Sequence, residues 1–139
     1  MVDQNCAYCM EGELVAKFGI KICELETSKV YLFKEQSHPG RCIVAHKKHV
    51  GDMNELTAEE RAAYFEDVAR VARAIMKAFN PDTVNYGAYG DTGHHLHFHL
   101  CPKYKDEYEW GGVFLMNPDK KYLTDEEYAD MIEKIKANL

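Results

Sequence analysis

The alternation of apolar and polar residues predicts strands in two parts of the chain. Three runs rich in β-branched and aromatic residues lie in the first third, separated by short polar stretches that favour turns: 20–25, 29–33 and 41–45. Two further runs, 83–88 and 94–101, flank the glycine-containing segment 89–93, which predicts a hairpin. The pattern therefore predicts five strands.

Apolar residues at helical spacing predict two helices. Thr57 and Glu60 form a capping box at the start of the first helix, and Asn80 followed by Pro81 marks its end. Its apolar stripe recurs every three or four residues: Tyr64, Val68, Val71, Ala72, Ile75 and Phe79. A second helix begins at the Thr124 capping box and places Tyr128, Met131, Ile135 and Leu139 on one face.

These elements predict an α+β fold. We expect a single antiparallel β-sheet with the long helix packed on it, and a C-terminal helix that closes the chain. No repeat or linker divides the sequence, so one domain should span residues 1–139, with its core at about 5–102 and a C-terminal extension at 103–139.

Composition and charge narrow the class of protein. With 46% apolar and 29% charged residues, the chain resembles ordinary globular domains, and no apolar run is long enough to span a bilayer. The first residues lack the features of a signal peptide, so we expect the cytoplasm and no membrane partner. A net charge of −6 argues against a nucleic-acid partner, but local clusters of Arg, Lys and His suit a small phosphorylated ligand.

The five cysteines do not indicate a disulfide framework. Their odd number and the missing signal peptide favour reduced thiols or a metal site. Cys23, Cys42 and Cys101 fall on predicted strands and should be small core residues. Cys6 and Cys9 form a CxxC, which is typical of unlinked thiols, a redox pair or half of a zinc site.

Histidines alternate along the last predicted strand. His95, His97 and His99 should share one face, because successive side chains of a strand point to opposite sides. The apolar residues between them should face the core: Leu96, Phe98 and Leu100. Three imidazoles on one face could bind a metal ion, or they could form a nucleophile and its helpers. A neutral imidazole can attack phosphorus near pH 7, because its reference pKa is about 6.5.

The run Gly90-Asp91-Thr92-Gly93-His94-His95-Leu96-His97-Phe98-His99-Leu100-Cys101-Pro102 resembles the histidine triad (HIT) motif, in which histidines alternate with apolar residues. The likeness extends to residues 39–44, 47–50 and 6–9. It implies a HIT-like fold and a bacterial-type HIT hydrolase. It also implies that His97 attacks the α-phosphorus of a nucleotide to give a nucleotidyl-histidine, while His99 contacts phosphate and assists the leaving group. His95 would orient His97 or bind a metal ion.

The same resemblance implies contacts to a nucleotide. Gly90 and Thr92 would hold phosphate, with Asn85 near the family's phosphate-side asparagine. Glu35 would bind ribose hydroxyls, and Tyr8 would line the base pocket.

Arg41 departs from the family pattern, because many members have a fourth histidine at this position. Arginine stays charged and cannot shuttle protons. It could bind a phosphate through two N–H groups or form a salt bridge with a surface carboxylate.

The resemblance also implies a structural zinc site. Some HIT-like proteins, including galactose-1-phosphate uridylyltransferases, complete a CxxC with two histidines that match His49 and His95. Cys6, Cys9, His49 and His95 would then bind zinc tetrahedrally. His46 is a rival ligand. His38 and His94 should face solvent or the pocket rim.

The leading functional hypothesis is a hydrolase of nucleoside phosphoramidates or dinucleoside polyphosphates. A nucleotidyltransferase or phosphorylase would use the same intermediate, and a zinc-stabilised nucleotide-binding module would form none. Metal chemistry on all three triad histidines is a further alternative. The family likeness implies a homodimer. Residues 110–114 could form a dimer contact, a pocket flap or a packed loop.

Overall fold

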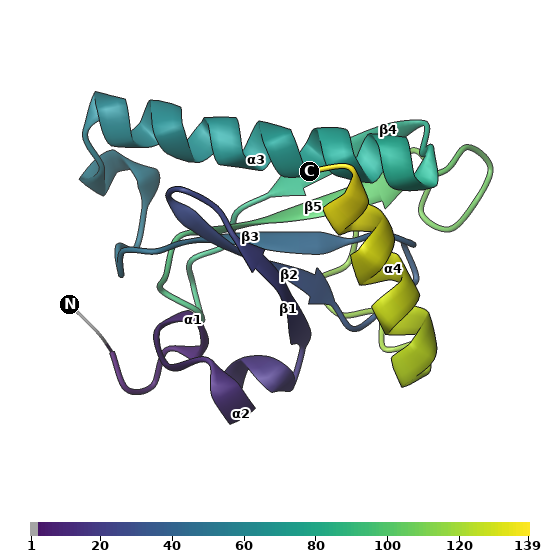
Figure 1. The fold of residues 1–139 in the computed structure, drawn as a ribbon, viewed down its shortest axis with the longest axis horizontal. Coiled ribbons are helices and arrows are strands. Elements are labelled where there is room, and N and C mark those ends of the chain that lie inside the picture. The colour runs from purple at the N-terminus through teal and green to yellow at the C-terminus, as the bar shows by residue number, and fades with distance from the viewer. Residues whose placement is uncertain (1–2) are drawn as a thin grey trace.

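The centre of the structure is one five-stranded antiparallel sheet, with strand order β1-β2-β3-β5-β4 (Figure 1). The computed structural model describes residues 3–139, so the first two residues of the predicted domain lie outside the described part. The strands are β1 (Gly19–Glu24), β2 (Ser28–Phe33), β3 (Cys42–His46), β4 (Thr83–Gly87) and β5 (His97–Lys103).

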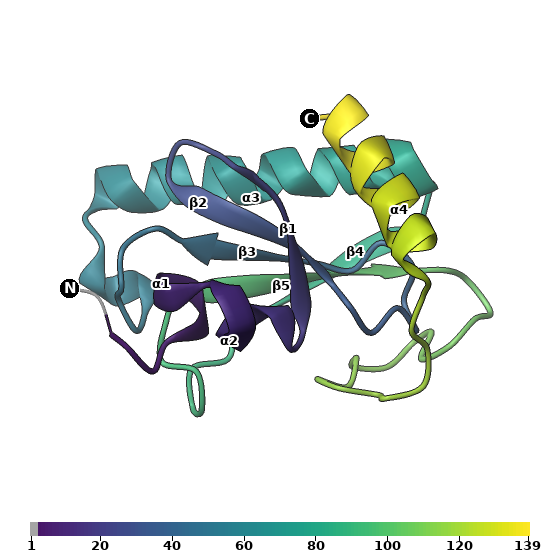
Figure 2. The same ribbon diagram turned by 60° about the horizontal axis from the view of Figure 1, so that its bottom comes forward.

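Helices cover both faces of the sheet (Figures 1 and 2). The long helix α3 (Ala58–Phe79) and the C-terminal helix α4 (Asp125–Ala137) pack on one face, where their apolar side chains join those of the strands in the main core. Two short helices, α1 (Ala7–Met10) and α2 (Gly12–Ala16), lie on the opposite face, and a 3-10 turn, η1 (Met53–Glu55), precedes α3. No helix within residues 3–139 combines the length and apolarity that crossing a membrane requires.

The predicted α+β architecture is confirmed. The capping boxes at Thr57 and Thr124 both form, and Asn80 ends α3 in the left-handed conformation. The sequence did not predict α1, α2 or η1, because helices of three to five residues are too short to show a periodic apolar stripe.

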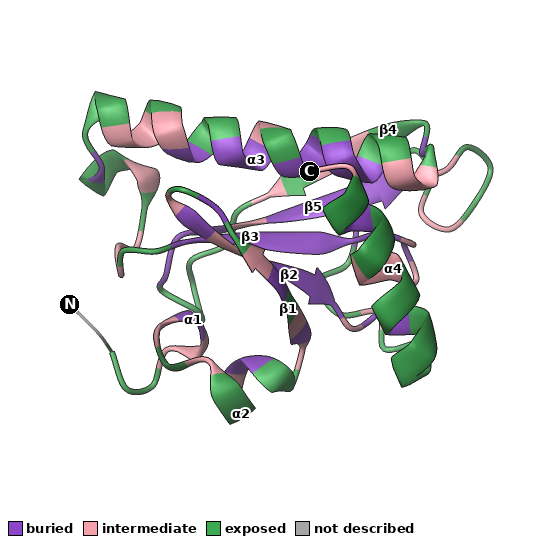
Figure 3. Cartoon of the chain, viewed as in Figure 1, coloured by how far each residue is buried: buried purple, intermediate pink, exposed green. Residues whose placement is uncertain are grey.

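Strand register assigns each side chain of β5 to a face. Ala45 pairs with His97 and Ile43 pairs with His99, and paired residues of neighbouring strands share a face. His97 and His99 therefore point toward the side of α1. Leu96 and Leu100 are buried in the main core with α3, as the alternation predicted. Figure 3 shows that β3 and β5, at the middle of the sheet, are largely buried.

The last strand is shifted relative to the prediction of 94–101. It begins at His97, because its neighbour β3 ends at His46 and the backbone of Leu96 bonds to His46 and Val50 instead. Strand β5 continues through Pro102. Its pairing with β3 ends at Leu100, so the missing N–H of Pro102 costs no hydrogen bond to β3. Gly87 pairs with His99, so a long loop at 88–96 replaces the tight hairpin turn.

Candidate active site

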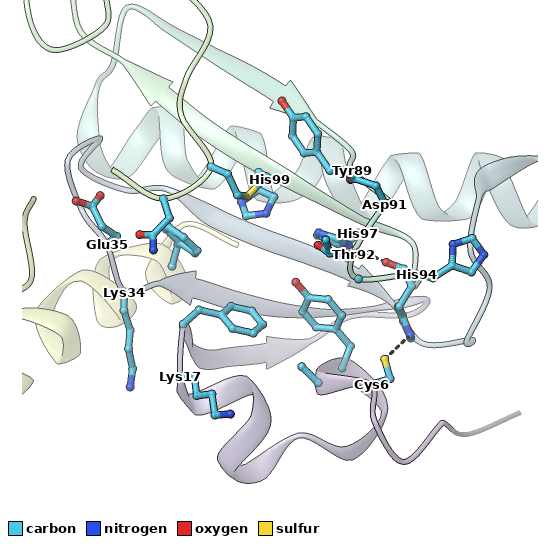
Figure 4. Close-up of a pocket in the computed structure, with 18 of the residues that line it drawn as sticks. Cys6, Lys17, Lys34, Glu35, Tyr89, Asp91, Thr92, His94, His97 and His99 are labelled. Carbon is cyan, nitrogen blue, oxygen red and sulfur yellow. Dashed lines mark hydrogen bonds between the residues drawn. The ribbon is translucent and has the colours of Figure 1, made fainter. Parts of the chain in front are cut away.

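A cavity of about 850 Å³ lies over the histidine face of the sheet. Its walls include residues 5–8 around α1, residues 91–95 of the loop before β5, and residues 113–117 of the C-terminal extension. Figure 4 shows His97 and His99 next to each other, with Glu35 toward one end of the cavity and Cys6 and His94 toward the other. The volume is in the range of small-molecule sites.

His97 has a fixed tautomer. Its Nδ1 lies 2.7 Å from the carbonyl oxygen of His95, and the ring is 8% exposed. Because a carbonyl oxygen can only accept a hydrogen bond, Nδ1 must carry the proton. Nε2, on the opposite side of the ring, keeps its lone pair and is the nitrogen available to the cavity.

His99 has the opposite tautomer. A terminal nitrogen of the Arg41 guanidinium lies 3.0 Å from Nδ1 of His99. Since a guanidinium can only donate, Nδ1 accepts and the proton is on Nε2. His97 therefore offers a lone pair and His99 offers an N–H group, with their ring centroids 5.3 Å apart.

His95 lies between the triad and a group of possible metal ligands. Its Nε2 donates to the carbonyl of His46 at 2.6 Å, which leaves Nδ1 unprotonated. This Nδ1 is 3.3 Å from Cys6 Sγ, 3.6 Å from Cys9 Sγ and 3.1 Å from His49 Nδ1. One ligand atom from each of the four residues lies within 4.8 Å of all the others. The four residues could hold a metal ion.

Burial keeps the triad rings neutral. Desolvation lowers the pKa of His97 from its ordinary value. Desolvation, together with the Arg41 charge, lowers the pKa of His99 to about 2. Desolvation likewise lowers the pKa of His95 to about 4. The triad therefore acts through lone pairs and N–H groups rather than through imidazolium charge at neutral pH.

Arg41 has partners that the sequence did not predict. It is fully buried and does not line the cavity, and it forms no salt bridge with a carboxylate of residues 3–139. Its guanidinium donates to the carbonyls of Leu115 and Met116 at 3.1 and 2.9 Å and lies over the rings of Phe33 and Phe114. Strand β3 begins at the next residue, so Arg41 is held behind His99 by its position at the strand end.

The other predicted nucleotide contacts are brought together only in part. Tyr8 and Thr92 line the cavity, and the Tyr8 ring lies 5.0 Å from that of His97. Gly90 lines a smaller adjoining pocket of about 60 Å³, which shares His95 and His97 with the cavity. Asn85 lies on β4 opposite Cys101 and is not among the residues that line the cavity.

Glu35 reaches the cavity, but its carboxylate has other partners. It accepts hydrogen bonds from the backbone N–H groups of Ser37, Lys120 and Lys121 and from the Ser37 hydroxyl. Desolvation alone would raise the pKa of Glu35, but these hydrogen bonds outweigh it, and the pKa is lowered. The carboxylate anchors the C-terminal extension to the sheet.

Three histidines outside the triad were assigned positions from sequence. His46 does not join the metal-ligand group, because its Nδ1 accepts from the N–H of Lys48 and its ring packs on Tyr64. The expectation that His38 faces solvent or the rim is wrong, since it is 2% exposed and bonds to Glu109 at 2.7 Å. His94 is exposed at the cavity rim, as expected.

The remaining cysteines follow the prediction in part. Cys42 and Cys101 are buried, whereas Cys23 is only partly buried and packs at the edge of the main core.

Several cavity residues were missed by sequence reasoning. Two cations, Lys17 and Lys34, and several aromatic side chains line the cavity: Phe18, Phe33, Tyr89 and Phe114. Phe114 and Val113 place residues 113–117 in the wall, which matches the flap alternative for this segment. The aromatic residues of 110–114 were the only sequence feature that pointed to this wall, and they did not indicate where the segment would fold.

Comparisons with known proteins agree with this geometry. A family model described as the HIT domain matches residues 19–106. The chain is 29% identical over 123 residues to "Protein hit" of Bacillus subtilis, covering 84% of this chain and 83% of that protein. It is 28% identical over 116 residues to an adenosine 5'-monophosphoramidase of Schizosaccharomyces pombe, covering 77% of this chain and 80% of that protein.

Solved structures share the fold. A histidine triad protein from Sinorhizobium meliloti superposes with a TM-score of 0.84 at 23% identity, covering 92% of this chain and 95% of that one. A zinc-bound histidine triad family protein from Mycobacterium smegmatis gives a TM-score of 0.68 at 22% identity, covering 95% and 93%. The family match spans most of the chain and includes the paired histidines on β5, and we conclude that this chain belongs to the HIT family.

Proposed function

We propose that this chain hydrolyses nucleotide conjugates, either nucleoside phosphoramidates or dinucleoside polyphosphates, through a covalent nucleotidyl-histidine on His97. The single observation that carries the proposal is the bond from His97 Nδ1 to the His95 carbonyl, which reserves the Nε2 lone pair for attack. The neighbouring His99 supplies an N–H group in the same cavity.

The chemistry needs two displacement steps at one phosphorus atom. In the first, Nε2 of His97 forms a bond to the α-phosphorus, and the bond to the leaving group breaks with its electron pair. In the second, water attacks the phosphorus and releases a proton to solvent, the P–N bond breaks with its electron pair returning to Nε2, and the nucleoside monophosphate leaves with neutral His97 restored. The N–H of His99 would stabilise negative charge on the phosphoryl oxygens.

The Schizosaccharomyces pombe relative supports a nucleotide substrate, because it is named as an adenosine 5'-monophosphoramidase. A transferase or phosphorylase would share the first step and would differ only in the acceptor. Product analysis with and without added phosphate separates these two outcomes.

We also propose that Cys6, Cys9, His49 and His95 bind zinc. Zn–S and Zn–N bonds of about 2.3 and 2.0 Å at tetrahedral angles separate ligand atoms by about 3.3–3.8 Å. The distances of 3.1–3.6 Å around His95 Nδ1 fit this spacing. The Nδ1 atoms of His49 and His95 lie 3.1 Å apart, and a shared cation would fit between these two nitrogens and the two thiols.

Zinc in this position would have a structural role. It would fix α1 against the sheet, and Tyr8, between the two cysteines, would be held against the His97 ring. The zinc-bound neighbour from Mycobacterium smegmatis supports a zinc in this fold. Zinc binding requires reduced thiols, which suit the cytoplasmic location that we expect. Light scattering would measure whether the chain forms the homodimer that the family resemblance implies.

The decisive experiment traps the intermediate. The protein is mixed with diadenosine tetraphosphate or adenosine phosphoramidate, quenched with denaturant and examined by intact-mass spectrometry and peptide mapping. We expect an adenylyl adduct on His97 in the wild-type chain. His97→Gln should abolish it and lower turnover about a thousandfold or more.

Two controls make this result specific. Thermal unfolding should show that His97→Gln folds, and His94→Gln, at the exposed rim, should still form the adduct. Undiminished hydrolysis by folded His97→Gln would reject His97 as the nucleophile. Nucleotide binding without any adduct in the wild-type chain would favour a binding module instead.

A further inference from the structure

Arg41 is buried beside the triad without a carboxylate partner. It is 0% exposed, and no acidic side chain among residues 3–139 lies within salt-bridge distance of it. Its Nε also has no hydrogen-bond partner. Burying a charge without an ion-pair partner is costly, so the contacts that Arg41 makes must offset that cost.

The contact between Arg41 and His99 restricts the protonation of His99. The guanidinium stays charged and occupies the acceptor position at His99 Nδ1, 3.0 Å away. A proton on Nδ1 would therefore face a donor and a positive charge. His99 can donate through Nε2, but it cannot become an imidazolium while this contact persists.

Arg41 also joins His99 to one wall of the cavity. The same guanidinium donates to the carbonyls of Leu115 and Met116, whose residues line the cavity. This wall is supported from behind by Glu109, which accepts from the N–H of Leu115 and bonds to His38. Lys103, 2% exposed, donates to the carbonyls of Glu109 and Gly112. Arg41 therefore contacts both the His99 ring and the cavity wall formed by Leu115 and Met116.

We propose that Arg41 is a positioning residue that holds His99 as a neutral Nε2–H donor, so that the site selects leaving groups that depart as oxyanions. This inference rests on the proposed function and narrows it. His97 Nε2 forms the bond to phosphorus, the P–O bond breaks, and the electron pair leaves on oxygen. His99 donates a hydrogen bond but transfers no proton. An amine leaving group must gain a proton as its P–N bond breaks, and His99 has no proton to spare.

The test compares leaving groups in a single-turnover reaction. Adenylylation of His97 is measured with adenosine 5'-phosphate esters of phenols of graded acidity, with diadenosine tetraphosphate, and with adenosine phosphoramidates of simple amines. Because general acid catalysis contributes about 10²–10⁴-fold, we expect the wild-type chain to react at least ~100-fold faster with the acidic phenols than with the amines.

Variants of Arg41 test its part in that preference. Arg41→Met frees His99 Nδ1 to accept a proton, and near pH 6 the preference should narrow by ~10-fold or more. Arg41→Lys keeps a charged donor beside His99 and should retain part of the preference for oxyanion leaving groups. Arg73→Met, an exposed arginine on α3, is the matched control and should leave the preference unchanged.

A second readout does not depend on turnover. In the wild-type chain labelled with ¹⁵N-histidine, His99, assigned by comparison with His99→Gln, should show an unprotonated Nδ1 and a protonated Nε2. A protonated Nδ1, or equal rates for amine and oxyanion leaving groups in the wild-type chain, would overturn the inference. These wild-type measurements decide even if Arg41→Met does not fold. Absence of any His97 adduct would instead reject the proposed function, while the NMR result still tests the Arg41 contact.

Discussion

At the scale of single residues, the three triad histidines differ through the partner of one ring nitrogen. His95 and His97 donate to backbone carbonyls, from Nε2 and Nδ1 respectively, whereas His99 accepts from Arg41 at Nδ1. Each contact leaves the other nitrogen with a defined character: a ligand lone pair, a nucleophilic lone pair and an N–H donor. Three identical side chains on one face therefore have three different chemical capacities.

Glu35 gives a residue-scale prediction about stability. Glu35→Gln removes the charge from a buried carboxylate that accepts four hydrogen bonds, and we expect a loss of about 1–3 kcal/mol in unfolding free energy. Urea unfolding measures this loss. Glu133→Gln, on the exposed side of α4, is the control and should change stability little. If the two variants are equally stable, the anchoring role of Glu35 is wrong.

At the scale of elements, short segments with little periodicity place the cavity walls. The turn before β3 sets the position of Arg41, and Gly40 in that turn has a φ of +95°. The N-terminal helix α1 places Tyr8 beside His97. The turn before β3 and helix α1 can each be tested by a single substitution.

The turn is tested by replacing Gly40 with alanine. A Cβ at Gly40 would lie 2.6 Å from the Phe79 ring in addition to the left-handed strain. Gly111 has a similar φ of +88° but open space around it. Gly111→Ala should cost about 1–2 kcal/mol for the backbone alone. Gly40→Ala should cost more, and equal losses of unfolding free energy in urea would contradict the packing argument.

The N-terminal element is tested through its metal. We expect one zinc per chain by elemental analysis, lost in Cys9→Ser and retained in Cys23→Ser, whose thiol lies on β1 outside the ligand group. Chelation should raise hydrogen exchange in residues 3–16 and leave α3 protected, because the main core does not include α1. Loss of the metal in His97→Gln would point instead to a metal bound by the triad.

At the scale of the whole molecule, the main core and the cavity lie on opposite faces of the sheet. The face toward α3 and α4 holds the main apolar core, and the face toward α1 has the triad imidazoles and the cavity. Burial of titratable groups on this second face ties stability to pH. Desolvation lowers the pKa of His97 as well as that of His99.

The direction of this pH dependence follows from proton binding. Above the ordinary histidine pKa of about 6.5, neither folded nor unfolded His99 is protonated, and stability is complete. Below it the unfolded chain takes up a proton that the folded chain excludes down to a pKa of about 2, so stability falls with decreasing pH. The slope is at most about 1.4 kcal/mol per pH unit for each such histidine.

Urea unfolding at pH 7, 6 and 5 measures this effect above the range where carboxylates titrate. His99→Gln should reduce the fall in stability between pH 7 and 5, while His94→Gln, which is exposed, should match the wild-type slope. Identical slopes for wild type and His99→Gln would show that the buried His99 ring does not resist protonation.

Much of the fold was predictable, because its signals are local. Capping boxes mark the helix starts, and alternation assigns Leu96 and Leu100 to the core and His97 and His99 to the opposite face. The CxxC and two distant histidines were matched through the family resemblance, and the fold brings those four residues together.

The sequence by itself determined the elements, the faces of β5 and the residues with chemical potential, since hydrogen-bonding periods and side-chain types are written in the chain. Only the tertiary structure decided how each imidazole is protonated, because the partners of His97 and His99 depend on contacts across strands and loops. It also decided that Arg41 lies behind His99 and that 113–117 forms a wall, since no local pattern specifies where a loop folds back.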